Sequence, residues 1–175
     1  MYDSVFSDVT YVAAVLRSTP SVLRAQLLSL DDAALRWRAT PEDWCIKEVI
    51  GHLIETDRDA FMGRIKTMIA SEHPTLGGMD IHGLVAERHD SERAVSELID
   101  ELAFQRVEIA DFVAGLTPED LACAGHYPRM GDLTVADFVY EWPFHDASHI
   151  AQIQDVIKAQ MLPHMGALMR KAVGG

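Results

Sequence analysis

Apolar residues return at every third or fourth position through four long segments, and this spacing restricts the fold of the chain more than any other feature. Residues 45–71 show it best, with a stripe formed by Ile46, Ile50, Leu53, Phe61, Ile65 and Met68. The other segments are residues 4–29, residues 91–115 and a segment that begins at Thr134. Such a stripe is the buried face of an amphipathic helix. Alternation bounded by turns, which would indicate strands, is absent.

Proline and glycine separate these segments. Pro20 either restarts the first helix or kinks a continuous one, and Pro143 should bend the last helix because proline lacks an N–H donor. Residues 77–90 and 125–131 are predicted as loops. We therefore predict one all-α domain over residues 1–175, a four-helix bundle with long connecting loops.

Composition narrows the class of protein. The 175 residues are 49% hydrophobic and 24% charged, which suits one domain with a real core. No stretch is apolar enough to cross a membrane, and the N-terminus does not resemble a secretory signal, so we expect a cytoplasmic protein. The net charge of −12 opposes binding to nucleic acid. Cys45 and Cys123 fit no metal motif; Cys45 is either activated at a helix start or buried as a small apolar residue.

Three histidines suggest a metal site. His145 and His149, in the run HDASHIAQ, lie four residues apart and project from one face of a helix. His52 lies at the edge of the apolar stripe of residues 45–71. Three neutral imidazoles with open positions form a known catalytic metal arrangement. We expect a divalent ion at His52, His145 and His149, Zn or Ni first, with Fe or Mn as alternatives.

Other interpretations compete with this one. A single histidine is more often an ordinary surface or core-edge residue, and the chain has eight of them. The spare histidines, expected in exposed loops or the tail, are His82, His89, His126 and His164. A di-iron site needs Glu-x-x-His pairs, which only Asp146-x-x-His149 approximates, so we discount it. Haem ligation by two histidines stays open.

Glu141 and Asp59 are the candidate catalytic carboxylates. On helical wheels Glu141 projects to the side of His145 and His149, and Asp59 to the side of His52. Each is a candidate general base or a support for the metal ligands. A charge on a solvated helix face is nevertheless the commoner role for such a residue.

Four segments of the chain resemble a known family. The segments WCIKEVIGHL (residues 44–53), Arg64-Ile65, GDLTVADF (residues 131–138) and HDASHIAQI (residues 145–153) are similar to the DinB/YfiT-like superfamily. The resemblance implies a four-helix bundle, often dimeric, in which His52, His145 and His149 bind a divalent metal. Some relatives are thiol-S-transferases or isomerases that use a low-molecular-weight bacterial thiol.

Together these features predict a divalent-metal-dependent enzyme that acts on a small-molecule substrate. A thiol-S-transferase or isomerase reaction with a low-molecular-weight thiol is the specific form that the resemblance implies. The alternative is a non-catalytic metal- or ligand-binding bundle protein related to stress, and a bundle whose histidines bind nothing is a third. We also expect a homodimer, because Ile54 and Ile69 extend the apolar arc of residues 45–71 beyond what one bundle needs.

Overall fold

The structure is a computed structural model that describes residues 8–174, and it confirms the helical bundle. Its helices run in chain order as follows: α1 (Val9–Leu27), α2 (Asp32–Arg36), α3 (Ile46–Glu55), the π-helix η1 (Thr56–Gly63), α4 (Arg64–Ala70), α5 (Ile81–Arg88), the short 3₁₀ turn η2 (Asp90–Glu92), α6 (Val95–Ala114), α7 (Pro118–Ala122), α8 (Val135–Met161), the 3₁₀ turn η3 (Leu162–His164) and α9 (Ala167–Ala172). Helix was also predicted for residues 4–7, which lie outside the described residues.

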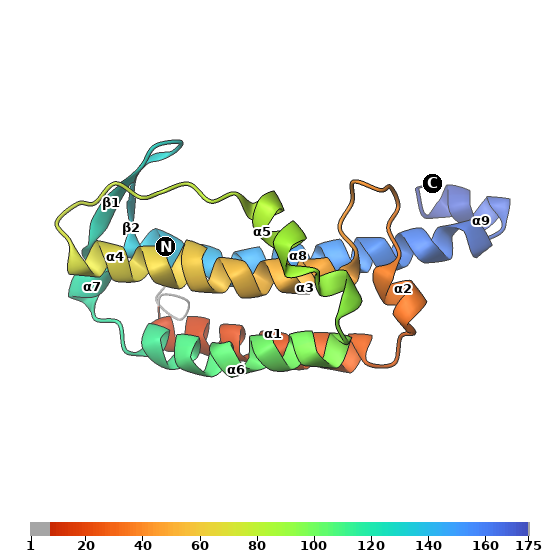
Figure 1. Ribbon diagram of the computed structural model, residues 1–175, viewed down its shortest axis with the longest axis horizontal. Coiled ribbons are helices and arrows are strands. Elements are labelled where there is room, and N and C mark those ends of the chain that lie inside the picture. The colour runs from red at the N-terminus through yellow and green to blue at the C-terminus, as the bar shows by residue number, and fades with distance from the viewer. Residues whose placement is uncertain (1–7, 175) are drawn as a thin grey trace.

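The long helices form two layers of an elongated bundle (Figure 1). Helices α1 and α6 lie side by side in one layer, and the α3–η1–α4 segment lies beside α8 in the other. Helix α1 passes through Pro20 as one helix, and α8 likewise continues through Pro143. Helix α8 begins after Thr134, where its segment was predicted to start, and Thr134 caps it: the Thr134 hydroxyl accepts from the N–H of Asp137, whose carboxylate accepts from the N–H of Thr134.

The prediction of no strands is wrong at one point. Strands β1 (Ala124–Tyr127) and β2 (Gly131–Thr134) form a short antiparallel hairpin at one end of the bundle. Gly131 adopts a positive φ of 95° in the turn, which glycine accepts without strain. Strands of four residues are too short to show a clear alternation, which is why the sequence did not reveal them.

The predicted loop of residues 77–90 also contains helix, namely α5. Asp80 caps it by accepting from the N–H of Gly83, and His89 ends it in the left-handed conformation with a φ of 53°. Helix α5 buries only Val85, so it has no apolar stripe that the sequence could show. Helix α6 starts at Val95, four residues later than predicted, because η2 occupies the preceding turn.

The core consists of two apolar clusters, one at each end of the bundle's length. The first contains Leu16, Phe61 and Trp142, and the second contains Leu23, Leu53 and Ile153, among others. Ile54 belongs to the second cluster and Ile69 packs against the first. These two residues are therefore used within one protomer, and the argument for a dimer that was based on them does not hold.

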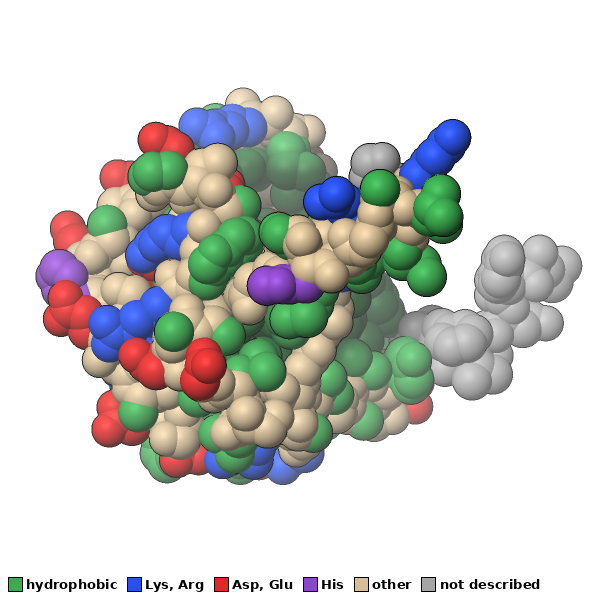
Figure 2. Space-filling view, turned by 90° about the vertical axis from the view of Figure 1, so that its right-hand side faces the viewer, with side chains coloured by type: hydrophobic (Ala, Val, Ile, Leu, Met, Phe, Trp, Pro, Cys, Tyr) green, Lys and Arg blue, Asp and Glu red, His purple; other side chains and the backbone are tan. Residues whose placement is uncertain are grey.

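The C-terminal segment leaves the end of the bundle opposite the hairpin (Figures 1 and 2). Among the described residues no helix is both long and apolar enough to cross a membrane.

Candidate metal centre

Three histidines from two elements converge where α3 lies beside α8. His52 comes from α3, and His145 and His149 come from successive turns of α8. The Nε2 atom of His145 lies 3.2 Å from Nε2 of His52 and 3.2 Å from Nε2 of His149. Nitrogens that bind one tetrahedral ion at about 2.1 Å lie about 3.4 Å apart, so the separations fit a shared cation. Elsewhere in residues 8–174 no comparable group of His, Cys, Asp and Glu side chains is found.

Burial keeps these imidazoles uncharged. It lowers the pKa of His52 to about 3, with a further contribution from the neighbouring His149 and His145. Burial likewise lowers the pKa of His145 to about 4 and lowers that of His149. All three rings are therefore neutral at pH 7, which is the form that binds metals.

Hydrogen bonding among the three rings cannot satisfy these nitrogens. A neutral imidazole nitrogen carries either one hydrogen or one lone pair, so Nε2 of His145 can complete only one of its two short contacts. A cation would accept all three lone pairs at once. The residues present therefore fit a divalent metal ion.

The Nδ1 atoms of the three rings differ in their hydrogen-bond partners. Nδ1 of His149 lies 2.7 Å from Oε1 of Gln152, one turn further along α8. If Nδ1 donates to this oxygen, the lone pair of Nε2 is directed into the site. Nδ1 of His52 and Nδ1 of His145 are buried and have no hydrogen-bond partner, so packing alone orients these two rings.

Aromatic side chains provide that packing. The ring centroid of Trp44 lies 4.9 Å from that of His52, and the ring of Phe61 lies 5.2 Å from that of His145. Phe61 in turn stacks on Trp142 at 4.8 Å. His82, on α5, is exposed and lies 5.2 Å from Trp44. The site thus has rigid aromatic walls on the sides of both histidine-bearing helices.

A buried ionic cluster formed by Arg106, Asp57 and Asp146 connects the helices that carry the histidines. Arg106 of α6 donates to both carboxylate oxygens of Asp57 at 2.6 and 2.8 Å, and to both of Asp146 at 2.6 and 2.7 Å. All three side chains are 98% or more buried. Burial alone would lower the pKa of Arg106, but the charges of Asp57 and Asp146 outweigh it and raise the pKa, so the guanidinium stays charged.

Further hydrogen bonds connect this cluster to every long helix. Trp142 donates to Asp57 at 2.7 Å, Thr19 of α1 donates to Asp146 at 2.6 Å, and Gln105 donates to Asp57 at 2.8 Å. Asp146 directly follows His145 in α8. The cluster therefore fixes the rotation of α8 about its axis, and with it the direction in which His145 and His149 point.

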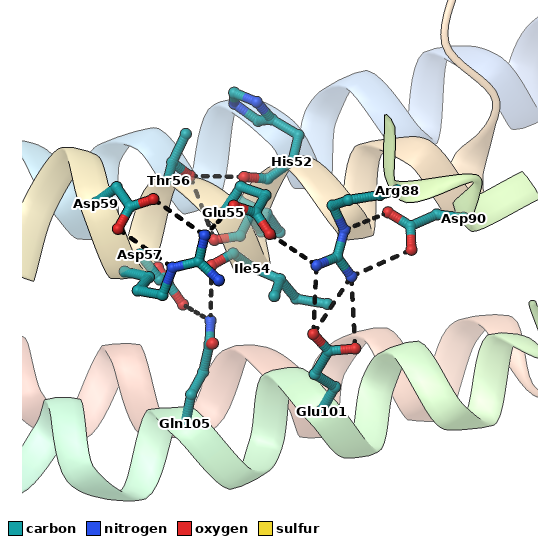
Figure 3. A network of polar contacts seen from close by, with 12 residues as sticks. His52, Ile54, Glu55, Thr56, Asp57, Asp59, Arg88, Asp90, Glu101 and Gln105 are labelled. Atoms are coloured by element: carbon teal, nitrogen blue, oxygen red, sulfur yellow. Dashed lines mark hydrogen bonds and ion pairs between the residues drawn. The ribbon is translucent and has the colours of Figure 1, made fainter. Parts of the chain in front are cut away.

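The π-helix η1 changes the position expected for Asp59. An unbroken α-helix would place Asp59 below His52, but a π-helix has a wider turn and rotates the residues that follow Thr56. The Asp59 carboxylate is about half exposed and pairs with Arg58 at 3.0 Å. Figure 3 shows Asp59 in the polar network that also contains Glu55, whereas the His52 ring points away from this network. The structure does not bring Asp59 into the histidine group.

Glu141 lies one turn before His145 on the same face of α8. Although the residue is exposed as a whole, partial burial of the carboxyl raises its pKa, and the charge of Arg64 opposes this rise. Glu141 is therefore a neighbour of the histidine group but is not part of it. Cys45 is fully buried, and burial raises the pKa of its thiol, so the interpretation of Cys45 as a small apolar residue is the better one. The spare histidines are exposed: His82, His89, His126 and His164.

Sequence reasoning missed the ionic cluster. Arg106 was not singled out, although it stands in a buried series at helical spacing with Leu102, Ile109 and Val113. A charged residue in such a series indicates a buried partner, because an unpaired charge would be too costly there. Asp57 gives the same signal, because it stands four residues after Leu53 and four before Phe61, within the apolar stripe of residues 45–71.

A protein-family match covers the part of the chain that carries the three histidines. The model of the DinB superfamily matches residues 16–153, a span that contains all three histidines. The chain belongs to the DinB superfamily. Among solved structures, this DinB protein resembles YfiT from Bacillus subtilis, described as a probable metal-dependent hydrolase with an unusual four-helix bundle topology. The two share 18% identity over 91% of each chain, with a TM-score of 0.77, which shows a common fold. No curated protein matches this DinB chain.

Proposed function

We propose that this protein is a divalent-metal-dependent enzyme that acts on a small molecule, with His52, His145 and His149 as metal ligands. The observation that carries the proposal is the convergence of three uncharged Nε2 atoms that cannot satisfy one another. The description of YfiT as a probable metal-dependent hydrolase supports the same class of chemistry. We expect Zn or Ni, with Fe or Mn as alternatives.

Residues around the histidines would orient the metal ligands and transfer a proton. A bound divalent ion lowers the pKa of a water or thiol and so supplies a nucleophile at neutral pH. Gln152 and the aromatic walls support the ligand rings, and Glu141, one turn before His145, is our candidate for accepting or returning a proton. Asp59 is the weaker candidate for that role, because it pairs with Arg58.

Two reactions suit this arrangement. Hydrolysis uses water as the nucleophile, as the description of YfiT suggests. Transfer or isomerisation with a low-molecular-weight thiol uses the thiol instead, as the family resemblance implies. Assays of the metal-loaded protein with ester, amide and electrophile substrates, each with and without added thiol, separate the two. The alternative function is a metal-binding protein without turnover.

The first prediction tests the metal itself. Protein purified without a metal-chelating column should contain about one equivalent of divalent metal by elemental analysis, and His149→Ala should lose it while retaining its helical circular dichroism. His164→Ala is the matched control, because His164 is exposed in η3 and should leave the metal content unchanged. Equal metal content in wild type and His149→Ala would contradict the assignment. Metal binding without any turnover would favour the non-catalytic alternative.

A further inference from the structure

Arg64, the first residue of α4, makes no direct ion pair, although its charge acts to lower the pKa of the nearby Glu141 carboxyl. In the part of the chain that the structure describes, every other buried or half-buried Lys or Arg forms an ion pair: Arg24, Arg38, Lys47, Arg88, Arg93 and Arg106. Arg64 is half-buried and forms none, although acidic residues outnumber basic ones by 27 to 15 in this chain. A half-buried guanidinium left unpaired in so acidic a protein is available to an anion from outside.

Aromatic rings and a carbonyl hold the guanidinium in place. It lies 4.9 Å from the ring centroid of Tyr127 and 6.0 Å from that of Phe138. Its Nη2 atom donates to the carbonyl of Gly77 at 3.1 Å. Such contacts orient an arginine but use few of its five N–H groups, so donors remain for a ligand.

A hollow of about 260 Å³ opens beside Arg64, between α4, the hairpin and α8. We call it the Arg64 hollow; its walls include Arg64, Tyr127, Leu133, Phe138 and Glu141. The aromatic and aliphatic side chains provide an apolar surface, and Arg64 is the only cation in the walls. The two carboxylates there are Glu141 and Asp137, and Asp137 accepts hydrogen bonds from Thr134 at the start of α8. Its volume lies just below the range of about 300–1,000 Å³ that is usual for small-molecule sites, which restricts it to a small ligand.

The Arg64 hollow lies about one helical turn from His145 along α8, and its other helical wall reaches His145 through the ring of Phe61. Glu141 precedes His145 by four residues, about 6 Å along the axis of α8. On the other wall, Arg64 follows Phe61 by three residues, and the ring of Phe61 contacts that of His145. A small molecule seated in the hollow would therefore extend toward the three Nε2 atoms.

We propose that the Arg64 hollow is the substrate subsite of the histidine centre and takes a small carboxylic acid with a flat apolar body, its carboxylate on Arg64. This inference rests on the proposed function. Arginine pairs with a carboxylate through two parallel N–H···O bonds, and the rings of Tyr127 and Phe138 suit a flat apolar group. A doubly charged phosphate fits less well, because one arginine must also offset the nearby Glu141.

Binding of benzoate and phenylacetate to the metal-free protein, compared with the neutral amides of both acids, tests the subsite independently of the metal. Wild type should bind the acids at millimolar concentration or better and prefer them to the amides by about tenfold or more. Amide chemical shifts should change near Leu133 and Phe138. No binding, equal binding of acids and amides, or shifts confined to the neighbouring hollow around Thr75 and Gly78, which Arg64 also borders, would overturn the proposal.

Variants separate the role of Arg64 from general damage. Arg64→Gln should abolish the preference for acids, whereas Arg129→Gln, which removes an exposed charge from the hairpin turn, should keep it. Glu141→Gln should tighten acid binding severalfold, because a like charge is removed, and misfolding cannot produce that gain. Unchanged acid binding in Arg64→Gln, or weaker acid binding in Glu141→Gln, would overturn the assignment.

A paramagnetic ion tests the connection to the histidines. With Co²⁺ added, the proton resonances of bound benzoate should broaden in wild type and should not broaden in His149→Ala. If wild type takes up Co²⁺ and binds benzoate without broadening, the hollow is not the subsite of that centre and the inference fails. If wild type takes up no divalent metal, the proposed function is wrong. The preference for acids over amides still shows in that case whether Arg64 binds carboxylates.

Discussion

Each imidazole of the site owes its charge state to where it is buried, and this makes the stability of the metal-free protein depend on pH. The folded pKa values of His52 and His145 are about 3 and about 4, against about 6.5 in an unfolded chain. Below about pH 6.5 these two imidazoles become protonated in the unfolded chain, whereas in the folded protein they stay neutral. The two neutral rings therefore leave the free energy of unfolding at its full value above about pH 6.5, and this free energy falls as the pH falls toward 4.

The second prediction follows from this difference. The free energy of unfolding of the metal-free protein should fall on acidification by up to about 1.4 kcal/mol per pH unit for each of these two histidines. Urea titrations from neutral pH to about pH 4 measure the slope. His52→Gln should make the slope shallower and the exposed control His164→Gln should not. Identical slopes in wild type and His52→Gln would show that the His52 ring is not held neutral by burial.

Gln152 gives the third prediction, also at the level of one residue. A hydrogen bond from Nδ1–H of His149 to the side-chain oxygen of Gln152 would direct the Nε2 lone pair to the metal, so Gln152→Ala should weaken metal binding about 10- to 100-fold with little loss of stability. Competition with a metal-sensitive dye measures the dissociation constant. Gln154→Ala is the matched control, since Gln154 projects from a different side of α8. An unchanged dissociation constant in Gln152→Ala would mean that this hydrogen bond does not support the ligand.

At the scale of the elements, the Arg106 cluster holds the bundle in register. Its members come from η1, α6 and α8, and Thr19 adds α1. The cluster lies between the two apolar clusters of the core in the sequence of each helix. A buried charge that loses its partner is expensive, so the three charges are interdependent.

The fourth prediction concerns that dependence. Arg106→Met should lower the free energy of unfolding by about 3–5 kcal/mol, because it leaves two buried carboxylates unpaired. The surface pair of Arg17 and Asp111 is the control, and Arg17→Met should cost less than about 1 kcal/mol. Chemical denaturation compares the two variants. Similar small losses in both would show that the cluster does not hold the helices together.

The helices themselves were largely predictable, and their irregularities were not. The apolar stripe of residues 45–71 correctly indicated helix, but the π-helix at Thr56–Gly63 leaves the same stripe in the sequence as an α-helix would. That difference moved Asp59 away from the side of His52, where an unbroken α-helix would place it. Within α8, by contrast, the spacing of His145 and His149 was enough to place both rings on one face, because the α-helical repeat is fixed locally.

At the scale of the whole molecule, several large apolar side chains remain exposed. The C-terminal segment projects from the bundle and carries many of them (Figure 2), and Leu168 and Met169 of α9 are 87% and 57% exposed. The end of α8 and the C-terminal segment also line a hollow of about 590 Å³, whose walls include Ile157, Met161, Leu162 and Met165. Exposed apolar surface of this kind usually marks an interface.

The fifth prediction is that the protein is a homodimer that buries this surface. Light scattering at tens of micromolar protein should give twice the mass of the chain, and Leu168→Glu should shift it toward the monomer. Ala172→Glu adds the same charge to an exposed small residue of α9 and should leave the dimer intact. A monomer mass for wild type would refute the homodimer, and a dimer that survives Leu168→Glu would place the interface elsewhere.

The sequence by itself determined the helical class, the family and the three histidines. Helical spacing and the i, i+4 relation of His145 and His149 are properties of neighbouring residues, so they can be read without the fold. That His52 meets the other two, and that their Nε2 atoms lie 3.2 Å apart, depends on how α3 packs on α8. That packing is set by contacts between residues far apart in the chain, above all those of Arg106, Asp57 and Asp146. Burial, the pKa values that follow from it and the hollow beside Arg64 arise only from this packing, and for that reason only the tertiary structure decided them.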